Sequence, residues 1–379
     1  MNRRKDLVVL LTLLMLSTAT AIADEGRIPV FRQTTIATPG HYILTRDIAV
    51  TGGVALNITA DGVTLDLNGH TLSSSSTTED LIQISGCGTK GFIIEGGKLQ
   101  GGRVGIHALP PGPCKLTVHD VTIGDPNVVG DPNIKGIFVE HTGQIAIRGI
   151  VINWTPSPGA VAIELSVPLT TPASPAGLAE ISGIIIDGGK GIKLTRVVGH
   201  LSDGLFSDPS GETSIDLVEA SGSSIYGIII EGGLQAGPQP HLRLIRSSGV
   251  RIEGCTLHGG AGGSRVPLND GLFMGPLSDN AMILDNTITG MGGDGIHIES
   301  QGSFVKGNLV NGGGSAGIFI GGANNLIESN KVAGNGQYGL YFDTSTGPHV
   351  FRGNVLRGQP TPLGGPGATG ATDGGGNIQ

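Results

Sequence analysis

The sequence predicts an all-β protein that folds as a right-handed parallel β-helix, a solenoid of about a dozen coils. Two markers keep a common period of about 22 residues in the C-terminal third of the chain. The first marker is a glycine that opens each apolar phrase, at Gly271, Gly295, Gly317 and Gly339. The second marker is an asparagine, at Asn286, Asn308, Asn330 and Asn354. The apolar runs between them are short, β-branched and bounded by glycine, which excludes a solenoid of amphipathic helices.

The chain begins with a segment typical of export signals. Arg3, Arg4 and Lys5 precede an apolar run, and Ala21-Ile22-Ala23 then gives a small-residue cleavage site. We therefore expect residues 1–23 to be a signal peptide, with a retained N-terminal anchor as the alternative. The mature protein is then secreted or periplasmic and has no membrane span.

The remaining chain divides into three parts. Residues 24–54 are irregular and contain Pro39-Gly40, which predicts an N-terminal cap. Residues 55–357 carry the repeats and predict the β-helix itself. Residues 358–379 are rich in glycine and proline and predict a loose covering or a disordered end.

Charge and composition exclude several classes of protein. The formal net charge is -8, and removing three basic residues and one acid with residues 1–23 leaves about -10. This balance argues against nucleic acid and anionic membranes as partners. The chain holds 67 glycines without a three-residue period, which excludes a collagen-like structure.

Stacked asparagines and cysteines have structural explanations. Asparagines at equal positions on successive coils form a ladder in which each amide bonds the next. Cys255 occupies the same position one coil earlier and is expected to be a packed core thiol. Cys87 and Cys114 are 27 residues apart, about one coil, so a disulfide and two reduced thiols both remain possible.

Strand alternation turns the middle residue of each apolar-x-apolar phrase outward. Collected coil by coil, these residues form one exposed column: Asn57, Gln83, His107, Phe138, Glu164, Lys193, Asp216, Arg243, Phe273, His297, Phe319 and Tyr341. One interpretation is a ladder of charged and aromatic pairs that stabilises the sheet. The other is a polysaccharide groove, in which aromatic rings stack on sugars and basic residues hold uronate carboxylates.

Two aspartates precede the repeating glycine on adjacent coils. Asp270 and Asp294 are therefore expected to lie close together, followed on the second coil by His297 and Glu299. Such a pair can share a proton, bind a cation or act as acid and base. Alternatively, Asp-Gly is simply favourable turn chemistry.

The repeats resemble the pectate-lyase-like β-helix superfamily. The phrase from Gly62 to His70 is similar to the opening coil of many secreted members, and the Gly-Ile-x-Ile and Ile-x-x-Asn-x-Val phrases resemble the generic β-helix repeat over residues 55–357. Asn269-Asp270-Gly271 and Gly293-Asp294-Gly295 also resemble the aspartate motifs of polygalacturonase-type hydrolases. That resemblance implies a second Asp at Gly295 and a His at Ala316, and both are missing, which argues against inverting hydrolysis.

These observations predict an exported protein that binds an acidic polysaccharide. If it is an enzyme, we expect it to process this polysaccharide by lyase or C5-epimerase chemistry. The candidate catalytic residues are Lys193, Arg243, Asp270, Asp294 and His297. The candidate substrate-binding residues are Glu164, Arg196, Asp216, Phe273, Phe319 and Tyr341. Ca²⁺ is a possible cofactor that could neutralise the uronate in place of Arg or Lys, although no dense aspartate cluster marks a site for it. The alternatives are a non-catalytic carbohydrate-binding or structural β-helix and a periplasmic accessory factor.

Overall fold

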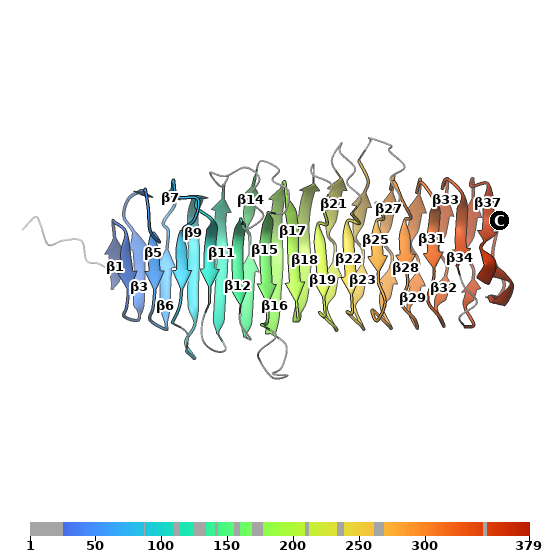
Figure 1. The fold of residues 1–379 in the computed structure, drawn as a ribbon, viewed down its shortest axis with the longest axis horizontal. Helices are drawn as coiled ribbons and strands as arrows, with labels where there is room; N and C mark the ends of the chain where they lie inside the picture. The colour runs from blue at the N-terminus through green and yellow to red at the C-terminus, as the bar shows by residue number, and fades with distance from the viewer. Residues whose placement is uncertain are drawn as a thin grey trace, which may run out of the picture.

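The computed structural model shows one long parallel β-helix, in which every strand pairing is parallel (Figure 1). It describes residues 26–379 except 87, 110–113, 125–133, 141–142, 155–159, 169–176, 209–211, 233–238, 261–268 and 344–346. The predicted signal peptide lies outside these residues. Within the described part of the chain, no helix is long and apolar enough to cross a membrane.

Face 1 of the coil is a sheet of 14 described strands, one from each coil. Their order along the axis follows the sequence: β2 (Thr34–Ile36), β5 (Leu56–Ile58), β8 (Ile82–Ile84), β10 (Val104–Ala108), β12 (Lys135–Glu140), β15 (Val161–Ser166), β17 (Lys190–Thr195), β19 (Ile215–Val218), β22 (Leu242–Ile245), β25 (Leu272–Met274), β28 (Ile296–Ile298), β31 (Ala316–Ile320), β34 (Tyr338–Phe342) and β37 (Thr361–Gly364). This sheet carries the predicted column.

Faces 2 and 3 belong to one connected network of 24 described strands. Face 2 contains β1 (Arg27–Val30), β3 (Gly40–Leu44), β6 (Val63–Asp66), β13 (Gln144–Arg148), β20 (Ser224–Tyr226), β23 (Arg251–Glu253), β26 (Met282–Leu284), β29 (Phe304–Lys306), β32 (Leu326–Glu328), β35 (Val350–Arg352) and β38 (Thr372–Asp373). Face 3 contains β4 (Ile48–Val50), β7 (Thr71–Ser74), β14 (Val151–Asn153), β21 (Ile229–Gly232), β24 (Thr256–His258), β27 (Thr287–Thr289), β30 (Leu309–Asn311), β33 (Lys331–Ala333) and β36 (Val355–Arg357). Four long strands bend around the corner and join both faces: β9 (Phe92–Gly101), β11 (Lys115–Ile123), β16 (Gly177–Asp187) and β18 (Val197–Asp208).

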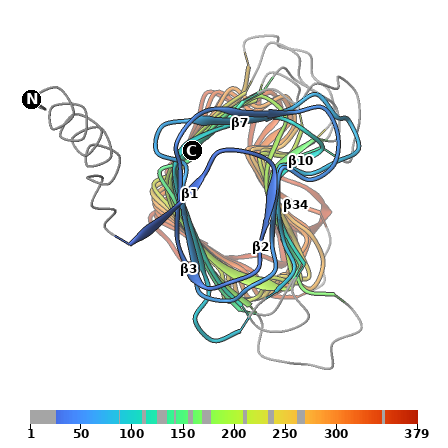
Figure 2. The same cartoon turned by 90° about the vertical axis from the view of Figure 1, so that its left-hand side faces the viewer.

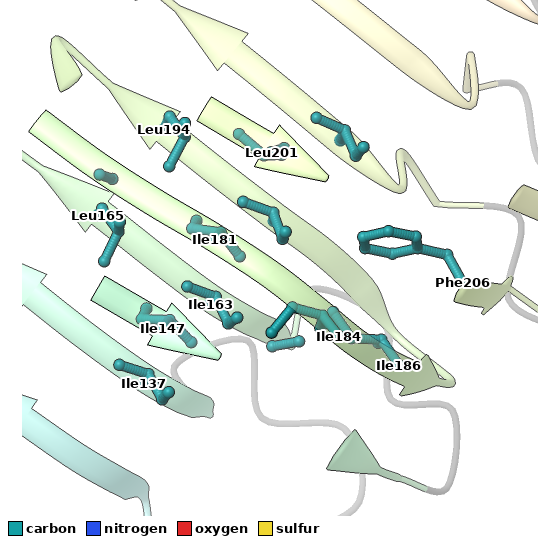
Figure 3. Close-up of a cluster of buried hydrophobic side chains, with 14 of the residues drawn as sticks. Ile137, Ile147, Ile163, Leu165, Ile181, Ile184, Ile186, Leu194, Leu201 and Phe206 are labelled. Carbon is teal, nitrogen blue, oxygen red and sulfur yellow. The ribbon is translucent and has the colours of Figure 1, made fainter. Parts of the chain in front are cut away.

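The interior is filled by aliphatic side chains because alternate residues of each strand point inward. Successive coils superimpose around this common interior when the molecule is viewed along its axis (Figure 2). Figure 3 shows the packing in the middle of the coil, where Ile163 and Leu165 of β15 lie near Ile181 of β16. All three side chains are buried, and burying each contributes roughly 1.5–3 kcal/mol.

The asparagine ladder is confirmed. Asn308 illustrates it, since its Nδ2 donates to Asn330 Oδ1 at 2.9 Å and its Oδ1 accepts from Asn286 Nδ2 at 2.9 Å. The ladder continues one coil further than predicted, to Asn377. Cys255 is buried, unpaired with another cysteine, and starts the ladder by donating its backbone N–H to Asn286 Oδ1, as expected.

Strands of the β-helix extend into both segments predicted to be its ends. Residues assigned to an N-terminal cap already coil, since β1 pairs with β3 and β2 with β5. These strands alternate inward and outward side chains as the other strands do, but they were not predicted because they lack the 22-residue markers. At the other end, residues 358–379 are not a loose tail, because β37 pairs with β34 before the short 3₁₀ helix η1 (Pro366–Gly370).

Cys114 is disulfide-bonded, whereas Cys87, its predicted partner, lies outside the described residues. A disulfide at this position constrains one early coil of the solenoid.

Candidate functional site

The strand register of face 1 places the predicted outward residues in one column. Each residue is the direct partner of the next, from Asn57 opposite Gln83 to Phe319 opposite Tyr341. The intervening pairs follow without a break: Gln83 with His107, His107 with Phe138, Phe138 with Glu164, Glu164 with Lys193, Lys193 with Asp216, Asp216 with Arg243, Arg243 with Phe273, Phe273 with His297 and His297 with Phe319.

The middle of the column contains ion pairs between residues of neighbouring strands. Glu164 lies between Lys135 and Lys193, with N···O distances of 2.7 Å and 3.0 Å. Burial alone would raise the pKa of Glu164, but these two ammonium groups hold it below its usual value. Lys193 is thus already engaged by a carboxylate, as the ladder interpretation predicts.

The next pair in the column joins Asp216 and Arg243. Arg243 donates from Nε and Nη2 to the two carboxylate oxygens of Asp216, at 2.9 Å and 2.6 Å. This hydrogen bonding raises the pKa of Arg243 above its ordinary value. Asp216 is fully buried, whereas 31% of the Arg243 side chain is exposed. The carboxylate therefore supports the guanidinium from beneath and leaves part of it at the surface.

Arg196 does not join the column. It follows the last residue of β17 with a φ of 58°, donates to the Val167 carbonyl and lies 3.9 Å from Glu219. These two contacts engage its guanidinium, and its predicted role in substrate binding stays a prediction.

Asp270, Asp294 and His297 come together at the C-terminal part of face 1. Asp294 Oδ2 lies 3.0 Å from His297 Nδ1, and Asp270 Oδ2 lies 3.6 Å from the same nitrogen. The two aspartates also act as a ladder: Asp270 Oδ1 accepts the Asp294 N–H and Asp294 Oδ1 accepts the Ala316 N–H, both at 2.7 Å. One oxygen of each carboxylate thus stabilises the coil, and the other faces the imidazole.

The electrostatics of this cluster favour proton transfer. Burial, together with the charge of Asp294, raises the pKa of Asp270 to about 6. Burial would lower the pKa of His297, but its hydrogen bond to Asp294 and the nearby carboxylates raise it instead. With the Nδ1 proton held by Asp294, Nε2 becomes the basic atom of the ring. Glu299 Oε1 lies 3.6 Å from Nε2.

Exposure separates the roles of these residues. The side chains of Asp270 and Asp294 are only 4% and 9% exposed, and that of His297 is 16% exposed. The aspartates lie behind the imidazole, so they position it rather than touch a ligand. Glu299, at 41% exposed, is the carboxylate of this group that faces solvent.

Asp270, Asp294 and His297 have ligand atoms within 4.8 Å of one another, a spacing that suits a metal ion. One imidazole nitrogen and two carboxylate oxygens resemble a transition-metal set. Ca²⁺ needs six to eight oxygen ligands, and both Oδ1 atoms here are already used by backbone N–H groups. The cluster therefore fits Ca²⁺ poorly.

An aromatic stack surrounds His297. Its ring centroid lies 5.2 Å from that of Phe273 and 4.2 Å from that of Phe319, which in turn lies 5.3 Å from Tyr341. Phe273 and Phe319 flank the imidazole, and its Nε2 is covered and has no hydrogen-bond partner among the described residues.

The missing hydrolase residues have a steric explanation. A Cβ atom on Gly295 would lie 2.2 Å from Val310 Cγ1 and 2.7 Å from the Gly317 carbonyl oxygen. The position faces the core, so it cannot carry the second aspartate of the polygalacturonase-type motif. Ala316, where the histidine would stand, is buried.

Sequence reasoning missed a second polar cluster on face 1. His107 Nδ1 lies 2.5 Å from Asp80 Oδ2, and Arg103 binds the same carboxylate from Nε and Nη2 at 3.0–3.2 Å. His107 also stacks on Phe138 with centroids 4.9 Å apart. His107 was visible in the column, but Asp80 lies 27 residues earlier with no motif to connect them.

Comparisons with known proteins agree with this fold. A family model described as "Right handed beta helix region" matches residues 244–361. The A-module of the mannuronan C-5 epimerase AlgE4 from Azotobacter vinelandii superposes with a TM-score of 0.55 at 14% identity, over 88% of this chain and 91% of that chain. A mutant of the periplasmic alginate epimerase AlgG gives a TM-score of 0.49 at 13% identity, over 93% and 84% of the two chains.

The alginate lyase AlyF-OU02, solved in complex with G6, gives a TM-score of 0.30 at 11% identity, over 95% and 82% of the two chains. No curated protein matches the sequence. The family model and the superposition on the AlgE4 module confirm the predicted right-handed parallel β-helix.

Proposed function

We propose that this chain is an exported protein that binds an acidic polysaccharide along the column of face 1 and processes it by lyase or C5-epimerase chemistry. The observation that carries the proposal is the contact between Asp294 Oδ2 and His297 Nδ1, at 3.0 Å, on an outward column that also holds basic residues. An imidazole oriented by a buried carboxylate is a general base suited to neutral pH.

The shared first step of both reactions is removal of the C5 proton, next to the uronate carboxyl group. His297 Nε2 is covered in the structure, so the neighbouring side chains move aside before it accepts this proton, while Nδ1 remains bonded to Asp294. Asp270 and Asp294 are positioning residues, and Glu299 is the second group able to give or take a proton at the surface. In a lyase the resulting carbanion expels the C4 substituent, and in an epimerase it is reprotonated from the opposite face.

A uronate carboxylate needs a cation near the reacting carbon. Arg243 lies two strand steps from His297 in the column, with Phe273 between them. Asp216 holds Nε and Nη2, so the remaining N–H groups of the partly exposed guanidinium can pair with a substrate carboxylate. Phe273 then supplies an apolar surface for a sugar ring between the two polar groups.

The similarity to the AlgE4 module supports an acidic polysaccharide as the ligand, because that protein is named a mannuronan C-5 epimerase and shares the fold over most of both chains. At 14% identity the likeness supports the fold and does not extend to individual catalytic residues. The residues proposed here therefore rest on their own geometry.

A non-catalytic glycan-binding protein is the second candidate. The pairing of Lys193 with Glu164 and of Arg243 with Asp216 favours it, since both candidate catalytic cations already have partners within the sheet. On this alternative the column is a stabilised binding surface, and His297 contributes no chemistry.

The two candidates are separated by assaying the mature protein on polymannuronate, polyguluronate and polygalacturonate, with and without Ca²⁺. Ultraviolet absorbance detects the unsaturated product of a lyase, and NMR of the recovered polymer detects epimerised residues. The proposal predicts product with at least one polymer and none for His297→Gln, with His258→Gln on exposed β24 as the matched control. Saturable binding without any product would support the non-catalytic glycan-binding protein. No binding to any polymer would refute both candidates.

A further inference from the structure

The Asp80, Arg103 and His107 cluster repeats the arrangement found around His297. Both histidines belong to the same column, and both bond a buried aspartate of face 1 through Nδ1. Each also stacks on the phenylalanine of the following strand, His107 on Phe138 and His297 on Phe319. The two sites thus repeat one arrangement on the fourth and the eleventh strand of face 1, and in both the imidazole Nε2 is covered.

The His107 site contains a polar atom that lacks a partner. The His107 side chain is only 7% exposed, and its Nε2 makes no hydrogen bond to any residue that the structure describes. Asn57 Oδ1, two strands earlier in the same column, also has no partner among the described residues. Protein interiors rarely leave such atoms unpaired, and His297 Nε2 at the other site is unpaired in the same way, so both sites point to a ligand that hydrogen-bonds there.

Charge indicates what that ligand is. Around Phe138, three cations lie among three carboxylates, so the charges balance: Arg103, Lys135 and Lys193 with Asp80, Glu140 and Glu164. Lys135 also places its Nζ 3.5 Å from the centre of the Phe138 ring. The His297 site, by contrast, combines one histidine with three carboxylates. An anionic sugar is therefore attracted more strongly to the His107 end of face 1 than to the His297 end.

We propose that Asp80, Arg103 and His107 form a second binding site for the same uronate chain that, on the proposed function, is processed at His297. Arg103, whose side chain is 38% exposed, takes the carboxylate, and His107 Nε2 accepts a sugar hydroxyl. The covering side chains must move aside for that second contact. Asp80 holds both groups in place and does not touch the ligand.

Seven strand-to-strand steps separate His107 from His297. At about 4.8 Å per step, the two sites are about 34 Å apart along a straight face. A uronate trimer is too short to reach both, so it occupies each site separately. A long polyuronate spans both and binds as one bivalent ligand, with an apparent affinity well above that of either site.

The test is isothermal titration calorimetry of the whole mature protein with a uronate trimer and with a long polyuronate of the same sugar. The wild type is expected to bind two trimers per chain. His107→Gln and Arg103→Gln each reduce this to one trimer and weaken binding of the long polymer at least about tenfold, because the bivalent gain is lost. His258→Gln on face 3 is the control and leaves both values unchanged.

A thermal melt for each variant shows that the coil is intact, and Arg103→Gln serves if His107→Gln does not fold. One trimer per wild-type chain, or unchanged binding in both variants, overturns the second site. The companion variant His297→Gln separates the two proposals. If His297→Gln is the variant that removes all trimer binding, the His107 site is wrong and the proposed function stands. If His297→Gln changes nothing while His107→Gln removes binding, the His107 site stands and the proposed role of His297 is wrong.

Discussion

Asp294 and His297 are joined by a 3.0 Å contact between Oδ2 and Nδ1, while the other oxygen of the same carboxylate accepts the backbone N–H of Ala316. One side chain therefore links the stacking of two coils to the orientation of an imidazole. The double use explains why a residue with good turn chemistry can also belong to a functional site.

The first prediction concerns Asp294→Asn. The amide oxygen can still accept the Ala316 N–H, so the melting temperature should change little, but the imidazole loses its anionic partner. We expect kcat on the active polymer to fall by about 10²–10⁴, the usual contribution of general acid–base catalysis. Asp294→Ala loses the ladder bond as well and should be destabilised by about 1–3 kcal/mol. Equal activity of Asp294→Asn and wild type would show that Nδ1 needs no carboxylate.

The second prediction concerns pH. The pKa of Asp270 is raised to about 6 from an ordinary value of 3.8, so folding favours its protonated form. Its contribution to stability is therefore complete below pH 3.8 and is lost as the pH rises through about 6. His297, whose pKa is also raised, adds a loss of the same sign as the pH rises through its folded pKa.

Asp270→Asn removes the pH-dependent contribution of Asp270 to stability and keeps a side-chain oxygen that accepts the Asp294 N–H. We expect it to stabilise the protein at pH 8 by up to roughly 3 kcal/mol and to have little effect at pH 3, as measured by urea unfolding. A stability difference that does not depend on pH would contradict the raised pKa.

The third prediction separates a structural ladder from a ligand groove in the column. Arg243→Ala leaves the buried Asp216 without its partner, which should destabilise the protein by about 3–5 kcal/mol. Adding Asp216→Ala should restore most of this loss. If the column is a groove, the double variant melts near the wild-type temperature and still binds polyuronate more weakly. If the double variant binds polyuronate with wild-type affinity, the column is a structural ladder and not a ligand groove.

The fourth prediction concerns the asparagine ladder. Asn308→Ala removes hydrogen bonds to the coils on both sides and leaves the buried Asn286 backbone N–H without its acceptor. At about 1–3 kcal/mol for each unpaired group, we expect a loss of at least about 3 kcal/mol in unfolding free energy. Asn311→Ala, on the exposed side of β30, is the control and should cost less than about 1 kcal/mol.

The fifth prediction concerns Gly295→Asp, which restores a residue of the hydrolase motif. The new side chain would meet Val310 in the core, so it should destabilise the coil by at least about 3 kcal/mol and create no hydrolase. Gly52→Asp is the control, because a Cβ there meets nothing within 4 Å. Polygalacturonate hydrolysis by a folded Gly295→Asp protein would refute the steric explanation.

The repeat made most of the fold predictable. In the C-terminal third, a glycine equivalent to Gly295 and an asparagine equivalent to Asn286 recur once per coil, and two markers with one period define the strands and their register there. The strands β1 and β37 were not predicted, because the first coil carries neither marker and the last coil carries only the asparagine, Asn377. Strand pairing with the next coil, rather than a sequence motif, determines their structure.

The site was only partly predictable. Spacing alone brought Asp270 and Asp294 together, but it could not show that they lie behind His297 and serve the backbone as well. The pairing of His107 with Asp80 was out of reach for a different reason. Coils in the N-terminal half vary in length, so which aspartate meets which histidine depends on loops that carry no period.

The most direct test of the account is exchange of the C5 proton of a polyuronate in D₂O, followed by NMR. Both lyase and epimerase chemistry begin by removing this proton, so the measurement does not depend on which product forms. We predict that the wild type incorporates deuterium at C5 in at least one polyuronate and that His297→Gln slows this at least about 10²-fold. No incorporation by the wild type into any polyuronate, or incorporation by His297→Gln at the wild-type rate, would contradict the account.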